Sequence, residues 1–137
     1  MRNLNRKALL ATALVAVAMG VTVAAVAATV TIKVPSTVSI KSNSLHFTGK
    51  VGTAANGKPC REQRKVTLFK VVGGGPDQAV GHDTTSANGA WSITPQGSAG
   101  ITLAHFYAKA KQRSDGAAGT IHVCLAAKSK TIGVSNP

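Results

Sequence analysis

Short runs in which hydrophobic and polar residues alternate recur along the chain from residue 29 onward. In the three most regular runs the hydrophobic or small positions are Val30, Ile32 and Val34; Leu45, Phe47, Gly49 and Val51; and Ala104, Phe106, Ala108 and Ala110. A period of two residues is typical of β-strands that bury one face. This part of the chain shows no helical period of useful length. The pattern therefore predicts an all-β fold.

Less regular runs complete the set of expected strands. In the run 65–72, Phe69 falls on the face opposite Val66 and Leu68, so this strand has a less cleanly divided pattern. The remaining runs cover 38–40, 91–93, 121–125 and 131–134.

Residues that favour turns separate these runs. Asn88 and Gly89 tolerate positive φ and predict a tight turn, and segment 73–78 predicts a long hairpin loop. Strands at this spacing predict one antiparallel sandwich of about seven strands. The turn and loop signals are Asn56-Gly57, Gly73 to Asp77, Asn88-Gly89, Pro95 to Gly100 and Asp115-Gly116.

Residues 1–27 have the pattern of a helical export signal. Basic residues precede an uncharged stretch over 8–32, and Ala25-Val26-Ala27 forms a small-residue cleavage box. We expect cleavage near Ala27, which leaves a single secreted domain over 28–137. The alternative is a retained membrane anchor, because the stretch is long enough to cross about 30 Å of hydrocarbon. Its weakly hydrophobic Ala, Thr and Gly content favours cleavage, and the domain lies outside the cytoplasm in both cases.

The chain has two cysteines, Cys60 and Cys124. In an oxidising compartment an even pair in a small domain predicts a disulfide. It would close a loop of about 65 residues, worth about 4 kcal/mol in the chain-entropy model. The alternative, a redox or metal pair, would be favoured by a CxxC spacing, which does not occur here.

Part of the chain resembles prealbumin-like sandwiches, the transthyretin-like and carboxypeptidase-regulatory-like domains. The residues that carry this resemblance are Gly49-Lys50-Val51, Asn56-Gly57-Lys58-Pro59, Val66-Thr67-Leu68 and Thr84-Thr85-Ser86-Ala87-Asn88-Gly89-Ala90-Trp91. Ser86 stands where the family pattern usually has Asp. The cysteine placement also resembles small secreted bacterial domains of unassigned function. The resemblance implies a sandwich of immunoglobulin-like or prealbumin-like type. It implies no reaction, because fold does not determine activity.

Candidate catalytic residues do not emerge from the sequence. The enzymes of the prealbumin-like group, the hydroxyisourate hydrolases, carry a C-terminal Tyr-Arg-Gly-Ser signature, whereas this chain has Ser129 to Val134 in that region. Four scattered acids give no carboxylate pair, and no Gly-x-Ser-x-Gly elbow or phosphate loop occurs. His46 and His105 fall on outward faces without a tight metal-ligand spacing. We therefore expect no enzyme activity, no metal and no cofactor.

The hydrophobic core is expected to centre on Phe47, Trp91 and Phe106. Trp91 is the only tryptophan and begins the strand after the Asn88-Gly89 turn. A buried indole contributes a large apolar area, so we interpret Trp91 as a core anchor rather than a ligand platform.

Positive charge is the sequence feature that bears most directly on function. The formal net charge is +12, and loss of the three basic residues in the export signal lowers it to +9. Basic residues cluster around both cysteines, so the predicted disulfide would join them into one basic region for an anionic partner. The candidate residues are Lys58, Arg61, Arg64, Lys65, Lys109, Lys111, Arg113, Lys128 and Lys130. The alternative is a solvated basic surface that keeps the domain soluble.

Two functional hypotheses follow. The first is a non-enzymatic module with a binding or structural role at the cell envelope, in contact with anionic polymers or acidic lipids. The second is a secreted hydrolase or inhibitor-like effector that uses the loops 73–78 and 95–100. Nucleic acid is disfavoured, because Tyr107 and Phe69 are the only aromatic residues expected to point outward. The sequence does not define the oligomeric state, although an edge strand over 30–34 could pair between copies.

Overall fold

A computed structural model describes residues 24–54, 58–97, 104–117 and 119–134. Most of the expected export signal, residues 1–23, lies outside these ranges, as do Asn56-Gly57 and the end of the predicted 95–100 loop. None of the helices in the described ranges is long and apolar enough to span a membrane. Regular structure in them consists of β-strands and one short 3-10 turn, η1 (Lys58–Cys60).

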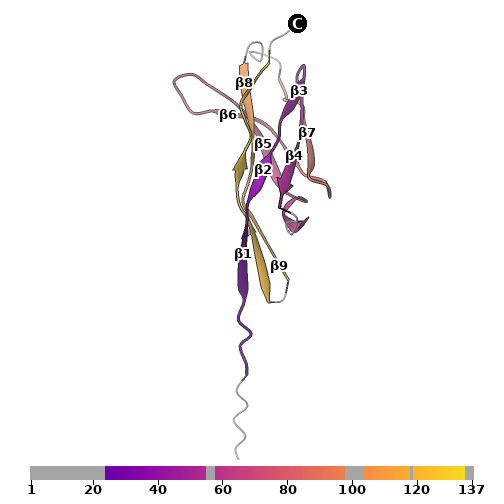
Figure 1. Ribbon diagram of the computed structural model, residues 1–137. Helices are drawn as coiled ribbons and strands as arrows, with labels where there is room; N and C mark the ends of the chain where they lie inside the picture. Colours follow the sequence, from indigo (N-terminus) through magenta and orange to yellow (C-terminus); the bar gives the residue numbers. More distant parts are fainter. Residues whose placement is uncertain (1–23, 55–57, 98–103, 118, 135–137) are drawn as a thin grey trace, which may run out of the picture.

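The strands form three sheets (Figure 1). The largest is antiparallel, in the order β11-β8-β5-β6 with β12 also paired to β8, and contains β5 (Lys65–Lys70), β6 (Gln78–Thr84), β8 (Ala104–Ala110), β11 (Ala127–Lys128) and β12 (Ile132–Val134). The second is also antiparallel and contains β2 (Ser36–Val38), β3 (Lys41–Asn43), β4 (His46–Thr53) and β7 (Ala90–Ile93). The third contains β1 (Val30–Val34), β10 (Thr120–Cys124) and β9 (Arg113–Ala117), with β1 parallel to β10.

The expected all-β class is confirmed, but the strands are more fragmented than the seven expected. Twelve segments occur in the described ranges. Pro35, which has no N–H to donate to a ladder, separates β1 from β2. Segments β2 and β3 both pair with β4 in one continuous register, Val38 with Val51 and Lys41 with Thr48, so they are one interrupted strand.

One hydrophobic core lies between the two larger sheets. Phe47 of β4 contacts Phe106 of β8, with ring centroids 4.7 Å apart, and both side chains are fully buried. Trp91 is 3% exposed and belongs to the same cluster. The three residues expected at the centre of the core are therefore all buried. Along β8 the predicted inward set, Ala104, Phe106, Ala108 and Ala110, is buried throughout.

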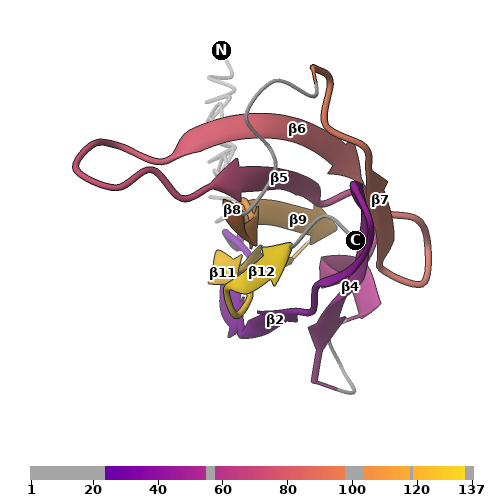
Figure 2. The ribbon, with the colours of Figure 1, turned by 90° about the horizontal axis from the view of Figure 1, so that it is seen from above.

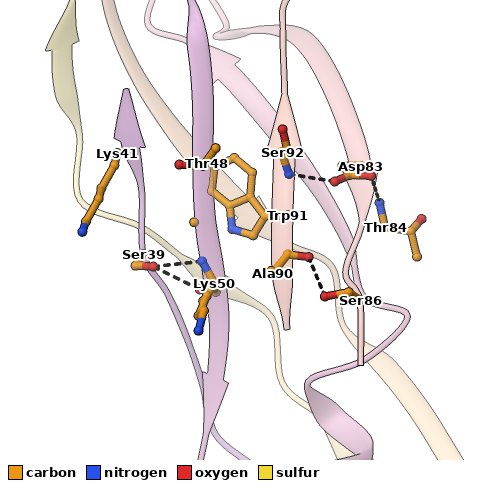
Figure 3. Close-up of a pocket in the computed structure, with 11 residues that line it drawn as sticks. Ser39, Lys41, Thr48, Lys50, Asp83, Thr84, Ser86, Ala90, Trp91 and Ser92 are labelled. Atoms are coloured by element: carbon orange, nitrogen blue, oxygen red, sulfur yellow. Dashed lines mark hydrogen bonds between the residues drawn. The ribbon is translucent and has the colours of Figure 1, made fainter. Parts of the chain in front are cut away.

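The two larger sheets meet at a corner between β6 and β7 (Figures 2 and 3). A side chain at Gly81 would place its Cβ 2.5 Å from Ile93 Cγ2, so the absence of one allows the two strands to approach. Asp83 Oδ2 accepts a hydrogen bond from the Ser92 backbone N–H at 2.7 Å, and Asp83 Oδ1 accepts one from Thr84 N–H. This carboxylate thereby covers the open edge of β7.

The predicted turn at Asn88-Gly89 joins β6 to β7. Gly89 has φ of 82° and donates its N–H to the Ser86 carbonyl at 2.9 Å. A Cβ at this glycine would overlap the Val51 carbonyl, and Val51 N–H donates to the Gly89 carbonyl at 2.9 Å. Both the positive φ and the close approach to β4 therefore require glycine.

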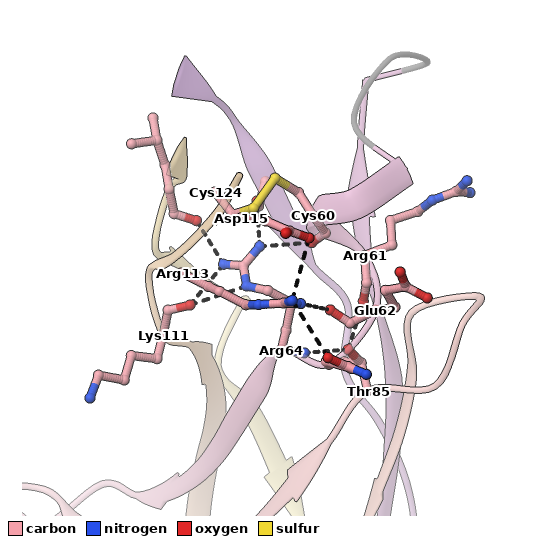
Figure 4. The surroundings of a disulfide bond; sticks show 12 residues. Cys60, Arg61, Glu62, Arg64, Thr85, Lys111, Arg113, Asp115 and Cys124 are labelled. Carbon is pink, nitrogen blue, oxygen red and sulfur yellow. Dashed lines mark hydrogen bonds and ion pairs between the residues drawn. A yellow bond between two sulfur atoms is a disulfide. The ribbon is translucent and has the colours of Figure 1, made fainter. Parts of the chain in front are cut away.

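A disulfide and a buried arginine join the three sheets at one end of the core (Figure 4). Cys60 and Cys124 form the predicted disulfide, with Cα atoms 5.2 Å apart. Beside it, the Arg64 guanidinium is completely buried and donates to Cys60 O (2.8 Å), Leu125 O (2.9 Å) and Ser36 Oγ (3.0 Å). Its Nε and Nη2 both donate to Lys111 O, at 3.1 and 2.9 Å. Segments from all three sheets thus share one cation.

The Arg64 guanidinium lies in a buried environment that disfavours its positive charge. Burial lowers its pKa, and the positive charge of Arg113 adds to the effect. Arginine nevertheless stays protonated in proteins, so the charge is balanced here by carbonyl dipoles. These five donor contacts leave Arg64 unable to meet an external anion. The expectation that it binds an anionic partner is wrong, because the fold uses its donors internally.

The first strand departs from the expected pattern of one buried face. Val30 and Ile32 are 56% and 43% exposed, and only Val34 is buried. In Figure 1, β1 and β9 extend away from the larger sheets, so no second layer formed by the described residues covers these side chains. Val34 alone reaches a small cluster with Cys60 and Cys124.

Replacement of Arg64 tests this junction. Arg64→Met keeps much of the side-chain volume and removes every donor, so several buried carbonyls would lose their partners. We expect the free energy of unfolding to fall by about 3–5 kcal/mol in urea titrations with the disulfide intact. Arg64→Lys should have a free energy of unfolding between those of the wild type and Arg64→Met, because one ammonium cannot match a planar five-donor group. Arg113→Lys is the control, and a loss below about 1 kcal/mol in Arg64→Met would contradict the role.

Candidate anion-binding face

The outward side of the β8–β5 pair gathers most of the predicted basic residues. Because Val66, Leu68, Ala108 and Ala110 point into the core, the residues between them point outward. The ladder pairs Thr67 with Lys109 and Phe69 with Tyr107. The outward residues of β5 and β8, with their neighbours, form what we call the basic face: Lys65, Thr67, Phe69, Tyr107, Lys109, Lys111 and Lys128.

The structure brings the two sequence clusters of basic residues together on this face. Lys65 belongs to the cluster near Cys60, and Lys111 to the cluster near Cys124. Lys111 N–H donates to the Lys65 carbonyl at 2.9 Å, so the two residues are neighbours. The column then continues along β8 to Lys109, and Lys128 of β11 pairs with Lys109. All four lysines are exposed, as is Lys130 beyond β11.

An aromatic pair lies beyond Lys109 on the same face. Phe69 stacks on Tyr107 with ring centroids 5.2 Å apart and an interplanar angle of 13°. Lys128 Nζ lies 3.8 Å from the centroid of the Tyr107 ring, a cation–π contact. Tyr107 is covered by these neighbours and is only 8% exposed, whereas Phe69 remains partly exposed. The aromatic surface available to a ligand is therefore smaller than the sequence suggested.

The loop between β5 and β6 contributes an acid to this cluster. The Tyr107 hydroxyl donates to Asp77 Oδ2 at 2.9 Å, and Val72 N–H donates to Asp77 Oδ1 at 3.2 Å. The predicted long hairpin loop, which projects from the body in Figures 1 and 2, is thus fastened to β8 at its base. Sequence reasoning missed this contact, since alternation within strands carries no information about loop side chains.

An open groove of about 390 Å³ crosses the basic face. Its walls include Thr67, Phe69, Lys109 and Lys111. The one salt bridge among the described residues joins Arg113 to Asp115 at 3.4 Å, so these lysines have no acidic partner there. The groove consequently combines a partly apolar floor with uncompensated positive charge, which attracts anions.

The remaining candidate arginines belong to the disulfide end rather than to the basic face. Arg113 donates to the Glu62 carbonyl at 2.7 Å and pairs with Asp115 (Figure 4). Arg61 is partly buried, and its Nε lacks a hydrogen-bond partner within the described residues. Lys58 begins η1, and its side chain lies outside the described part.

Two histidines, His82 and His105, lie on the outward side of the same sheet as the basic column. Within the described residues, no group of three or more His, Cys, Asp or Glu side chains could hold a metal ion. His46 contacts two hydroxyls on the outer side of the second sheet: its Nδ1 lies 2.9 Å from Thr94 Oγ1, and its Nε2 lies 3.2 Å from Ser92 Oγ. This Ser–His contact joins β4 to β7 and was not foreseen from the sequence.

Comparison with known proteins adds no family assignment. No protein-family model matches the sequence, and no curated protein matches it significantly. A function for this protein must therefore be inferred from the geometry of its basic face.

The single tyrosine of the chain allows a direct test of the Tyr107–Asp77 contact. Burial raises the pKa of Tyr107, and the hydrogen bond and negative charge of Asp77 raise it further. Because this pKa is raised, the stability that the protonated Tyr107 hydroxyl contributes is complete below about pH 10. It is lost as the pH rises through the pKa of Tyr107 in the folded protein. Asp77→Asn should lower the pKa, measured by tyrosinate absorption in alkaline titration. Asp115→Asn is the control, and an identical titration in Asp77→Asn would contradict the contact.

Proposed function

We propose that this protein is a non-enzymatic module that binds extended anionic polymers at the cell envelope through its basic face. The observation that carries the proposal is the column of Lys65, Lys111 and Lys109 on one exposed sheet surface, where no described residue gives them an acidic partner. A row of cations along two strands suits a polymer with repeated negative charges, since each charge can meet another lysine. The groove beside Phe69 offers apolar contact to the parts of the polymer between its charges.

An extracytoplasmic location fits this role. The Cys60–Cys124 disulfide indicates a non-reducing environment. Secretion through a signal cleaved near Ala27 remains part of the proposal, with a retained membrane anchor as its alternative. Acidic lipid head groups present the same negative charge as envelope polymers. Nucleic acid is disfavoured, because Tyr107 is covered and only Phe69 of the pair is left to stack on a base.

We also propose that the two larger sheets form an immunoglobulin-like or prealbumin-like sandwich. Support comes from the shared core and from the positions of the quoted motifs. Gly49-Lys50-Val51 lies in β4, Val66-Thr67-Leu68 lies in β5, and the Thr84–Trp91 segment forms the turn from β6 to β7.

Retention on cell-wall material rich in phosphodiester polymers tests polymer binding. The protein without residues 1–27 should be retained at low salt and released as salt screens the lysines. Lys109→Gln with Lys111→Gln should weaken retention about tenfold or more, because each lysine near an anionic surface contributes about 1 kcal/mol. Lys41→Gln with Lys50→Gln removes the same charge from the other sheet and serves as the control. Equal loss in both double variants, or no retention at low salt, would defeat the proposal.

A hydrolase is the second candidate, favoured by the Ser92–His46 contact of 3.2 Å. A serine next to a histidine is the core of a nucleophile–base pair. Here the other ring nitrogen meets the Thr94 hydroxyl instead of a carboxylate, and both side chains are exposed on a sheet surface. A polar ladder across two strands accounts for the same contacts.

Chromogenic ester substrates separate these interpretations. We expect the wild-type protein to hydrolyse them no faster than buffer, because neither side chain is shielded from water. Hydrolysis that disappears in Ser92→Ala and in His46→Gln, but persists in Ser42→Ala, would instead establish the enzyme. Ser42 is an exposed serine of β3 and provides the matched control.

A further inference from the structure

We propose a second, separate binding site, for a sugar acid, in the groove on the outer side of β3, β4 and β7. The groove has a volume of about 660 Å³, within the range of small-ligand sites. Its walls include Ser39, Lys41, Thr48, Lys50, Trp91 and Ser92 (Figure 3). The basic face belongs to the other sheet, so this site does not depend on polymer binding there.

The sheet is locally distorted beside the groove. In the register of β2, β3 and β4, Ser39 lies opposite Lys50. Ser39 N–H donates to the Lys50 carbonyl at 2.9 Å, but Lys50 N–H donates to Ser39 Oγ at 2.9 Å rather than to the Ser39 carbonyl. The side chain thus replaces its own carbonyl in the ladder.

Gly49 gives space to the displaced carbonyl and to the indole. A Cβ at Gly49 would overlap the Ser39 carbonyl oxygen. It would also lie 2.6 Å from Cζ2 and 2.7 Å from Cε2 of Trp91. Cε2 is bonded to the indole nitrogen, so the N–H edge of Trp91 packs against Gly49 on the core side of β4, beneath the groove.

The indole N–H has no acceptor. Trp91 Nε1 is one of two buried side-chain polar atoms without a hydrogen-bond partner among the described residues, the other being Arg61 Nε. Buried polar groups are almost always hydrogen-bonded, because an unmet donor costs about 1–3 kcal/mol. This nitrogen is enclosed on the core side of β4, so the indole lies next to the groove without contacting a ligand in it.

The charged groups of the groove favour an anion. Lys41 and Lys50 are exposed on its β3–β4 side, and their ammonium groups have no acceptor within the described residues. Asp83 is the acid on the opposite side, and both of its carboxylate oxygens already accept backbone N–H groups. The free groups are therefore mostly donors.

These features together define the class of ligand. A carboxylate would meet the two lysines, and sugar hydroxyls would meet Thr48, Thr84 and Ser92 along the walls. The apolar floor at Ala90 suits the face of a sugar ring. A hexuronic acid, alone or as a disaccharide, combines all three properties, whereas inorganic phosphate would leave most of the groove empty.

The single tryptophan makes this site observable, because intrinsic fluorescence reports on Trp91 alone. Titration with glucuronic acid and a glucuronate disaccharide should give a saturable fluorescence change and a matching heat in calorimetry. Lys41→Gln with Lys50→Gln should weaken binding about tenfold or more, as loss of charge-assisted hydrogen bonds predicts. Both lysines are exposed, and circular dichroism would verify that the variant is folded.

Two comparisons distinguish this site from the polymer-binding face. Lys109→Gln with Lys111→Gln should leave glucuronate binding unchanged while it weakens retention on phosphodiester polymers. Glucose and inorganic phosphate should each bind at least about tenfold more weakly than glucuronate. The proposal is overturned by the absence of both fluorescence change and heat, by equal binding of glucose or phosphate, or by full binding in the Lys41/Lys50 variant.

Discussion

The fold depends on one buried cation that has no carboxylate beside it. Arg64 collects carbonyls from η1, from the end of β8 and from the residue after β10, together with the hydroxyl of Ser36 in β2. Each of these acceptors would be costly to bury alone, and the guanidinium would be costly to bury without them. The disulfide joins two of the same segments covalently. Cation and disulfide thus attach the third sheet to the two larger sheets, which share the hydrophobic core.

This junction also determines where positive charge can act. Two of the arginines near the disulfide are occupied: Arg64 is enclosed, and Arg113 pairs with Asp115 and the Glu62 carbonyl. The lysines on the neighbouring sheet surface have no acidic partner in the part of the chain that the structure describes. Arginine, with its planar donors, serves structure here, and lysine, with a flexible and hydrated charge, forms the exposed surface. A count of basic residues around the cysteines could not separate these two roles.

Some parts of the structure could be predicted from the sequence because they depend on local patterns. Alternation identified β4 and β8 with their buried residues, and Asn88-Gly89 identified the turn into β7. The features that were missed depend on contacts between distant segments. Val30 and Ile32 are exposed because the described residues form no layer over β1, and the Ser39 side chain replaces its own carbonyl in the pairing with Lys50. Neither feature can be predicted from the spacing of hydrophobic residues.

The parallel pairing of β1 with β10 has a consequence for the order in which the chain can fold. Val30 pairs with Thr120 and Val34 with Cys124, so the first strand of the domain finds its partner near the end of the chain. Chains are synthesised from the N-terminus, so β1 must wait until almost every other strand has been made. Contacts between such distant segments are slow to form, because a long loop must close first. Until then, its exposed valine and isoleucine side chains and unpaired backbone offer a surface on which newly made copies can aggregate.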